Sequence, residues 1–296
     1  MMSKTPLVSI LMNCHNGEDF LSQSLSSALN QTYQNWELIF FDNASNDSSK
    51  EIFDEFCDSR FKYFYNSNKT SLADARNKAI DKALGEWIAV LDTDDSWHRE
   101  KLEEQLTSLQ DQNDPNKVGL IFTSAEIDFG NDRKSVSNTF ETEDFLDDLL
   151  STKLTIPWSS ALFSKKLFYR IGQFDSQYPS YHDYALSLSL AEVSKVIFIN
   201  KPLTCIRVHE NSLSSQQKRN DGKYFLEIQS IIRKYFPRES AIEGYYILTL
   251  KSLANSFFQF NLIALIKKLY ALNYYDFLMS FKILLKMLKK YINKYD

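Results

Sequence analysis

The sequence predicts an α/β fold, a mixed but mainly parallel sheet flanked by helices, followed by a helical C-terminal region. In the first half of the chain, short apolar runs alternate with helical segments, which is the pattern of βαβ units. Beyond Ser215 only helical periodicity continues. Residues 260–296 hold seven Lys and two Asp, a local charge of +5; because the whole chain carries −4, the remainder carries −9. We therefore expect two domains, residues 1–215 and residues 216–296.

The strand signals are short runs rich in β-branched and aromatic residues. In chain order the expected strands are Leu7–Met12, Trp36–Phe41, Phe61–Tyr65, Trp87–Leu91, Val118–Thr123, Ala161–Phe163 and Val196–Ile199. The second run is nearly all apolar, which is typical of a strand covered on both faces. The segments with helical spacing between and after these runs are Gly17–Thr32, a helix ending near Cys57, Ser71–Leu84, Arg99–Gln110 and Asp183–Val193.

Composition excludes several classes of protein. Hydrophobic residues make up 44% and charged residues 24%, as in an ordinary globular protein. The formal net charge of −4 argues against a nucleic-acid partner. The three cysteines, Cys14, Cys57 and Cys205, form neither a disulfide framework nor a metal-binding spacing, so we expect a cytoplasmic protein. We also expect no signal peptide and no transmembrane span.

Polar residues follow the expected strands at the points where the strands end. They are Asn13, His15 and Asn16, then Asp42 and Asn43, then Asp92, Asp94 and Asp95. In a parallel sheet the ligand crevice lies at the carboxyl ends of the strands, so these side chains should converge there.

Asp92 and Asp94 are alternate residues of an extended segment and should share a face. Two adjacent carboxylates repel each other unless a proton or a cation joins them, and hard oxygen ligands suit Mg or Mn. The other interpretation is a solvated acidic turn. Placement directly after a buried strand favours the metal site.

Other candidates have ordinary structural alternatives. Asp42 is either a ligand for a base or ribose hydroxyl, or the cap of an Asx turn. Arg76 either contacts a diphosphate or is a solvated helix charge. Asp183 is either a helix N-cap or a general base, and His182 beside it could alter its basicity. His209 is either a metal ligand or an ordinary histidine.

Taken together, these residues resemble the family 2 glycosyltransferases with the GT-A fold. The segments that carry the resemblance occur in this order: Pro6–Asn16, Ala28–Tyr33, Glu37–Asp47, Ala73–Asn77, Gly85–Asp95, Gly172–Asp175, Asp183–Leu186 and Arg207–Ser212. Any one segment is a weak signal, but the ordered set over about residues 5–215 is specific.

The resemblance implies inverting transfer of a sugar from a nucleotide diphosphate, UDP by default, to a glycan or lipid-linked hydroxyl, with divalent Mn or Mg. It assigns Asp183 as the catalytic base and Asp92, Asp94 and His209 to the metal. The implied donor-binding residues are Asn13, His15, Asn16, Asp42, Arg76, Asp92, Arg207 and Ser212. By analogy, we expect a role in bacterial surface polysaccharide synthesis.

The chain departs from the family pattern at three places. Asn13 stands where the family usually has Pro, Asn43-Ala44 where it has Asp-Gly, and His182 where it has Glu. Two rival functions remain: a catalytically silent sugar-nucleotide or membrane-surface binding module, and a sugar nucleotidyltransferase. The second prefers a glycine-rich loop after the first strand, where this chain has only Gly17.

The C-terminal segment 257–295 combines apolar residues at helical spacing with intervening lysines. A basic amphipathic helix of this kind can lie on an anionic membrane, which would place the protein at the inner face of the cell membrane. Packing against the acidic catalytic domain, or against a second subunit, explains the pattern equally well.

Overall fold

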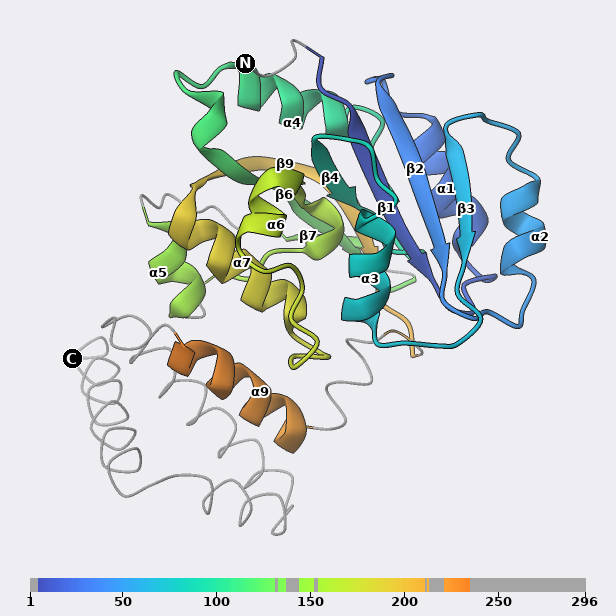
Figure 1. Cartoon of the computed structure of the whole chain (residues 1–296). Coiled ribbons are helices and arrows are strands. Elements are labelled where there is room, and N and C mark those ends of the chain that lie inside the picture. The colour runs from blue at the N-terminus through green and yellow to red at the C-terminus, as the bar shows by residue number, and fades with distance from the viewer. Residues whose placement is uncertain are drawn as a thin grey trace. The chain divides into compact units, whose positions relative to one another are not determined.

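The computed structural model describes residues 5–130, 133–136, 144–151, 154–210, 212 and 221–234 (Figure 1). The chain forms two compact units, one from residues 1–141 and 156–209, the other from residues 142–155 and 210–296. The sheet and all the candidate residues except Ser212 belong to the first unit. The predicted division into a catalytic domain, residues 1–215, and a helical region, residues 216–296, stays a prediction.

The described strands form one mixed sheet in the order β3-β2-β1-β4-β8-β6-β9-β5, with β7 on β6. Their bounds are β1 Val8–Cys14, β2 Trp36–Asp42, β3 Phe61–Tyr65, β4 Trp87–Val90, β5 Ser96–Trp97, β6 Val118–Asp128, β7 Arg133–Val136, β8 Leu162–Ser164 and β9 Lys195–Arg207. The first four strands are parallel, as the βαβ pattern predicts. β8 then runs antiparallel between β4 and β6. The fold class is therefore confirmed, and the sheet is mixed.

Helices cover both faces of the first half of the sheet. In the first unit they are α1 Leu21–Leu29, α2 Ser49–Asp54, α3 Leu72–Ile80, α4 Lys101–Gln110, α6 Lys165–Arg170 and α7 His182–Val193, with 3-10 turns Pro115–Lys117 and Trp158–Ser160. The second unit has α5 Phe145–Leu150 and α9 Asp221–Lys234. α1 begins later than predicted because Gly17–Phe20 forms a turn, in which the Gly17 carbonyl accepts from the amides of Phe20 and Leu21.

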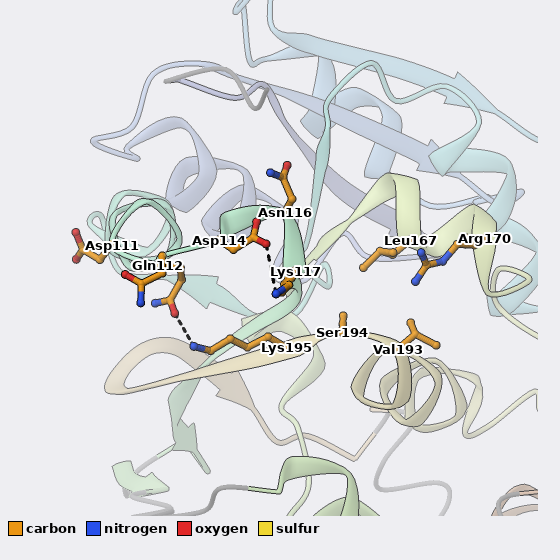
Figure 2. Close-up of a pocket in the computed structure, with 11 residues that line it drawn as sticks. Asp111, Gln112, Asp114, Asn116, Lys117, Leu167, Arg170, Val193, Ser194 and Lys195 are labelled. Atoms are coloured by element: carbon orange, nitrogen blue, oxygen red, sulfur yellow. Dashed lines mark hydrogen bonds and ion pairs between the residues drawn. The ribbon is translucent and has the colours of Figure 1, made fainter.

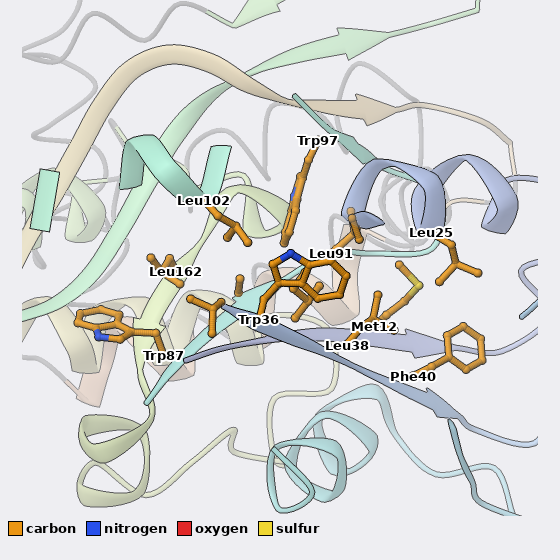
Figure 3. Close-up of a cluster of buried hydrophobic side chains, with 14 of the residues drawn as sticks. Met12, Leu25, Trp36, Leu38, Phe40, Trp87, Leu91, Trp97, Leu102 and Leu162 are labelled. Atoms are coloured by element: carbon orange, nitrogen blue, oxygen red, sulfur yellow. The ribbon is translucent and has the colours of Figure 1, made fainter. Parts of the chain in front are cut away.

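The core lies between the sheet and helices α1 and α4 (Figure 3). Strand β1 alternates: Met12 and Cys14 join this core, so Asn13 faces the other side, toward α3. Trp36, Phe40 and Leu102 are fully or almost fully buried in the same cluster. Each such side chain contributes roughly 1.5–3 kcal/mol to folding, so this layer fixes the ends of β1 and β4 in place.

Strands β6 and β9 are longer than predicted, and this difference matters for the site. Sequence periodicity ends β9 at Ile199, but the strand continues to Arg207. It does so by shifting register opposite Thr123–Ala125, which accommodates Pro202 without losing the ladder. The extension carries Arg207 back to the acidic turn after β4.

The predicted amphipathic segment 257–295 lies outside the described residues. Helix α9 confirms that helical structure begins again after residue 215. Among the described residues, we find no helix with the length and apolarity needed to cross a membrane.

Candidate functional site

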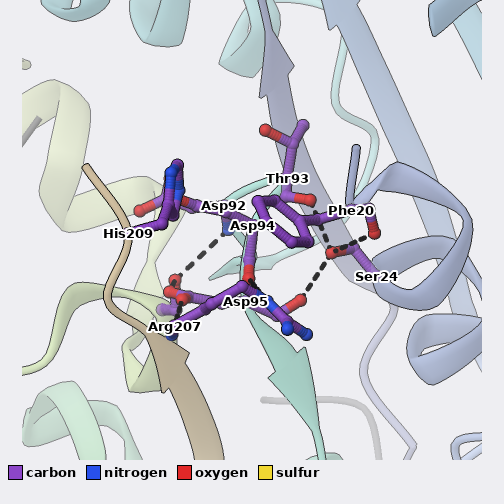
Figure 4. A network of polar contacts seen from close by, with 9 residues as sticks. Phe20, Ser24, Asp92, Thr93, Asp94, Asp95, Arg207 and His209 are labelled. Atoms are coloured by element: carbon purple, nitrogen blue, oxygen red, sulfur yellow. Dashed lines mark hydrogen bonds and ion pairs between the residues drawn. The ribbon is translucent and has the colours of Figure 1, made fainter. Parts of the chain in front are cut away.

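The turn Asp92–Asp95 follows β4 and is held from three sides (Figure 4). The Asp95 carboxylate is buried, and accepts hydrogen bonds from the Ser159 hydroxyl and from the Arg207 amide, the latter at 3.0 Å. The Ser24 hydroxyl of α1 lies 2.7 Å from the Thr93 carbonyl and 2.5 Å from that of Asp95. Burial, and then the Asp94 and Asp92 carboxylates, raise the pKa of Asp95 well above its usual range. Asp95 is therefore an anchor between the turn and β9.

Asp94 and His209 meet at this turn. His209 Nε2 lies 3.0 Å from Asp94 Oδ2, and both side chains are partly exposed. Burial and the nearby Asp92 raise the pKa of the Asp94 carboxyl, although His209 acts in the opposite direction. The turn thus concentrates negative charge beside one imidazole, and a cation would relieve the repulsion.

Phe20 and Gln23 hold the strand end that carries His209. The Arg207 guanidinium lies 4.4 Å from the centre of the Phe20 ring, and the His209 ring centre lies 5.0 Å from it. Arg207 Nε donates to the Asp94 carbonyl at 3.2 Å, and its Nη2 donates to Gln23. Figure 4 shows Phe20, Arg207 and His209 together around the turn.

Arg76 connects the turn to α7. Its side chain, only 3% exposed, donates from Nη2 to Asp92 Oδ1 at 2.8 Å, while its Nη1 lies 2.9 Å from His182 Nε2. Burial, and then the Arg76 charge, lower the pKa of His182 to about 3, so this histidine is neutral. Arg76 is an inward-facing cation of the site and not a solvated helix charge.

Asp183 lies in the first turn of α7, next to His182. It is inside the helix, because the N-cap position is Tyr181. Its Oδ1 accepts a hydrogen bond from the Tyr184 amide at 2.7 Å. Burial raises the pKa of the Asp183 carboxyl, and the Arg76 charge opposes that rise. A carboxylate whose pKa lies above its usual value is better matched to accepting a proton near neutral pH.

Asp42, at the end of β2, is engaged by the protein itself. Its Oδ1 accepts from the Ser45 amide at 2.7 Å, and its Oδ2 accepts from the Tyr63 hydroxyl at 2.6 Å. Burial, and then Asp42, raise the pKa of Tyr63. This geometry favours the Asx turn over a group waiting for a ligand.

The segment after β1, His15 and Asn16, contacts the turn that follows β2. Asn16, at a φ of 57°, accepts from the Asn46 amide, and His15 Nδ1 lies 3.0 Å from the Asn43 carbonyl. Both amide atoms of Asn13 are buried without a hydrogen-bond partner among the described residues. Ser212 is buried and belongs to the second unit, so its role stays a prediction.

The predicted three-ligand metal site is not assembled. In the described ranges no group of three or more His, Cys, Asp and Glu side chains is close enough to hold a metal ion. Asp94 and His209 meet, whereas Asp92 points its Oδ1 at Arg76. Asp94 and His209 still fit a divalent cation, since a carboxylate oxygen and an imidazole nitrogen lie within 3.0 Å in a negatively charged turn.

Sequence reasoning missed the residues that support the site. Phe20 was expected in a helix, whereas it lies before α1 and contacts Arg207 and His209. Ser24 and Ser159 carry no motif signal, and only their contacts in the fold show their role. Trp158 is a core residue, buried against Phe163 and Phe174.

A separate groove of about 740 Å³ lies at the amino-terminal starts of β6 and β9 (Figure 2). Its lining includes Asp114, Lys117, Arg170 and Lys195. β8 is antiparallel to both β4 and β6, so β4 and β6 point in the same direction. The groove at the start of β6 therefore lies at the opposite end of the strands from the candidate site, which follows the end of β4. It contains none of the candidate residues.

Comparison with known proteins finds relatives among the glycosyltransferases. The chain is 29% identical over 250 residues to the UDP-Glc:alpha-D-GlcNAc-diphosphoundecaprenol beta-1,3-glucosyltransferase WfgD of Escherichia coli, covering 84% of this chain and 95% of that protein. It is 34% identical over 114 residues to the putative teichuronic acid biosynthesis glycosyltransferase TuaG of Bacillus subtilis, covering 38% of this chain and 45% of TuaG.

Solved structures share the fold at low sequence identity. The crystal structure of S. aureus TarS 1-349 in complex with UDP-GlcNAc matches with a TM-score of 0.66 and 14% identity, covering 84% of this chain and 74% of that one. The mannosyltransferase PcManGT from Pyrobaculum calidifontis, in complex with GDP-Man and Mn2+, matches with a TM-score of 0.62 and 17% identity, covering 92% and 76%.

The profile described as "Glycosyl transferase family 2" matches residues 9–172, more than half of the chain. That range holds the first four strands, Arg76 and the whole Asp92–Asp95 turn. The chain therefore belongs to glycosyl transferase family 2 and is a glycosyltransferase.

Proposed function

We propose that this glycosyltransferase is inverting and moves a sugar from a UDP-sugar to the hydroxyl of a glycan or lipid-linked acceptor, in bacterial surface polysaccharide synthesis. The observation that carries the proposal is the Arg76 guanidinium, which joins Asp92 to His182, the neighbour of Asp183 in α7, while Asp94 meets His209 at the same turn. The name of WfgD, with its UDP-Glc donor and diphosphoundecaprenol-linked acceptor, supports the substrate classes. The UDP-GlcNAc complex of TarS supports the donor nucleotide.

In the proposed reaction Asp183 takes the proton of the acceptor hydroxyl as that oxygen attacks the anomeric carbon. The bond from that carbon to the diphosphate oxygen breaks in the same step, and UDP leaves. Arg76 and Arg207 bind the diphosphate region, and Asn13, His15 and Asn16 surround the base, while Asp42 holds the neighbouring turn after β2 through the Ser45 amide. A Mn or Mg ion on Asp94 and His209, with Asp92 beside it, would neutralise charge on the leaving phosphate.

The test is a panel of UDP-, GDP- and dTDP-sugars, assayed with a prenyl-diphosphate-linked sugar acceptor, with Mg, with Mn and with EDTA. We expect nucleoside diphosphate release from UDP-sugars that depends on the acceptor and the metal. Asp183→Asn should lower turnover about 100- to 10,000-fold, the usual size of general-base help, with little loss of donor affinity.

Three outcomes would overturn the proposal. Donor binding without any release would mark a binding module. Release of inorganic diphosphate would mark a nucleotidyltransferase. Near wild-type turnover in Asp183→Asn would show that another group takes the proton.

We also propose that segment 257–295 contacts anionic lipid at the inner face of the membrane, where a lipid-linked acceptor resides. The support is its lysine-rich amphipathic pattern. Co-sedimentation with anionic vesicles at low salt should capture the whole chain, but not a version ending at Gln259. Equal binding by both would show that the segment packs against protein.

A further inference from the structure

The contact between Arg76 and His182 joins residues that are distant in the sequence. The guanidinium is buried and has two oriented partners: Nη2 donates to Asp92 Oδ1 at 2.8 Å and Nη1 lies 2.9 Å from His182 Nε2. An arginine has only donors, so His182 Nε2 is the acceptor of this bond. The histidine proton is therefore on Nδ1, and the ring is neutral.

The surroundings of His182 keep it in that state. The residue is 2% exposed, and the Phe174 ring packs edge-on against it with centres 5.2 Å apart. The facing charged groups are Arg76 from α3 and Asp92 from the turn after β4; the first disfavours a protonated ring and the second favours it. The backbone carbonyls of Tyr178 and Pro179 also favour protonation, but burial and Arg76 prevail.

We propose that His182 is a positioning residue: as a neutral acceptor it fixes the Arg76 guanidinium against Asp92 without cancelling the arginine charge. Asp92, Arg76 and Asp183 then sum to a formal charge of −1. A carboxylate at position 182 would make the sum −2, next to the proposed base and to a donor that carries a diphosphate. The histidine thus keeps one cation available for both.

The inference predicts different behaviour for two substitutions of similar size. His182→Gln supplies a neutral carbonyl acceptor to Arg76, so donor affinity should stay within about 3-fold of wild type. His182→Glu keeps an acceptor but adds a negative charge, so donor affinity should fall about 10-fold or more. It should also raise the apparent pKa of the acidic limb of kcat/KM by about one unit, because a like charge next to Asp183 disfavours its ionised form.

The experiment measures UDP affinity by calorimetry and the pH profile of kcat/KM for wild type, His182→Gln and His182→Glu, with thermal melts to check folding. Equal UDP affinity and equal pH profiles in Glu and wild type would overturn the inference. So would a Gln variant that is as impaired as Glu.

Nitrogen-15 spectra of the wild-type histidine rings test the inference without any substitution. They should show one ring that is protonated on Nδ1 only and unchanged from pH 5 to pH 8, and that signal should be missing in His182→Gln. The inference would be contradicted if the signal lost in His182→Gln came from a ring that titrates between pH 5 and pH 8 or is protonated on Nε2. The inference rests on the proposed function because its pH profile assumes that Asp183 is the base. UDP affinity and the ring spectra do not depend on turnover. A failure of Asp183 as base would therefore be seen separately, in Asp183→Asn.

Discussion

The turns after β2 and β4 begin with the same kind of sequence, a carboxylate followed by small polar residues, yet they do different work. At the β2 turn, both Asp42 oxygens are satisfied by the Ser45 amide and the Tyr63 hydroxyl. At the β4 turn, Asp92 faces Arg76 and Asp94 faces His209. We therefore expect the carboxylate surrounded by local donors to be structural, and those whose charged partners come from distant segments to take part in the chemistry.

The largest expected difference between the turns concerns activity. Asp94→Ala should lower transfer about 1000-fold, equivalent to about 4 kcal/mol, because it removes the carboxylate that faces His209. The melting temperature should change little, since Asp94 is partly exposed and lies after the buried strand. Turnover with Mn and a thermal melt check this. A variant that keeps full activity, with or without EDTA, would place Asp94 in the same structural class as Asp42.

The next largest effect is expected on the free energy of unfolding, from a change at Glu37, which lies at the opposite end of β2 from Asp42. Its carboxylate accepts from Ser9, from Lys62 and from the Leu84 amide at 2.5–2.6 Å. Burial raises the pKa of Glu37, but these donors outweigh it, so the net pKa is lowered. A lowered folded pKa stabilises the protein above the unfolded value near 4.3 and loses that stability as pH falls.

Glu37→Gln should therefore cost about 3 kcal/mol at pH 7 and clearly less at pH 3.5, measured by urea unfolding. Asp54→Asn is the matched control, because its ion pair with Lys50 is exposed and should matter by less than about 1 kcal/mol. An equal cost for Glu37→Gln at both pH values would contradict the assignment.

Asp42→Ala should cost about 2 kcal/mol of stability, since it leaves the partly buried Ser45 amide and Tyr63 hydroxyl without their acceptor. A cycle with Tyr63→Phe sharpens the point: the double variant should cost less than the sum of the two. Additive costs would mean that the Tyr63 bond contributes nothing. A large loss of UDP affinity with unchanged stability would return Asp42 to the ligand-binding class.

The smallest effect is expected at Phe20, which supports the β4 turn through Arg207 and His209. Phe20→Leu retains apolar bulk but removes the aromatic face, so KM for the donor should rise about 5-fold, or about 1 kcal/mol. Steady-state kinetics measure this. An unchanged KM would show that the polar contacts of Arg207 and His209 hold the end of β9 without help from the Phe20 ring.

Local pattern was sufficient for the parallel half of the sheet. The strand Phe61–Tyr65 has the predicted bounds, and β1, β2 and β4 lie within about two residues of theirs, because these runs are bounded by turn residues. The sequence pattern did not predict which strands pair when they are distant in the sequence. The antiparallel β8 and the bulged extension of β9 depend on partners far away in the sequence.

The candidate site shows the same division. Convergence of Asp92, Asp94 and the β2 turn is expected from the strand ends. His209 is a candidate metal ligand from its own sequence context, and Arg207 is assigned to the donor through the family resemblance. Contacts made by buried polar side chains, such as Arg76 with His182 or Ser159 with Asp95, have no periodic signal. These contacts depend on how segments that are distant in the sequence, such as α3 and α7, are placed relative to one another in the fold. The sequence pattern does not specify that placement.

The place of β3 at one end of the sheet order has a consequence for colloidal behaviour. In the described part of the chain, no strand pairs with its outer edge. The strand reads Phe-Lys-Tyr-Phe-Tyr, and Tyr65 is 58% exposed, so this edge is a template for pairing between molecules. Lys62 interrupts the aromatic run with a charge, and the strand is short. Concentrated solutions should thus depend on this one lysine to resist strand-by-strand aggregation, far from the chemistry of the enzyme.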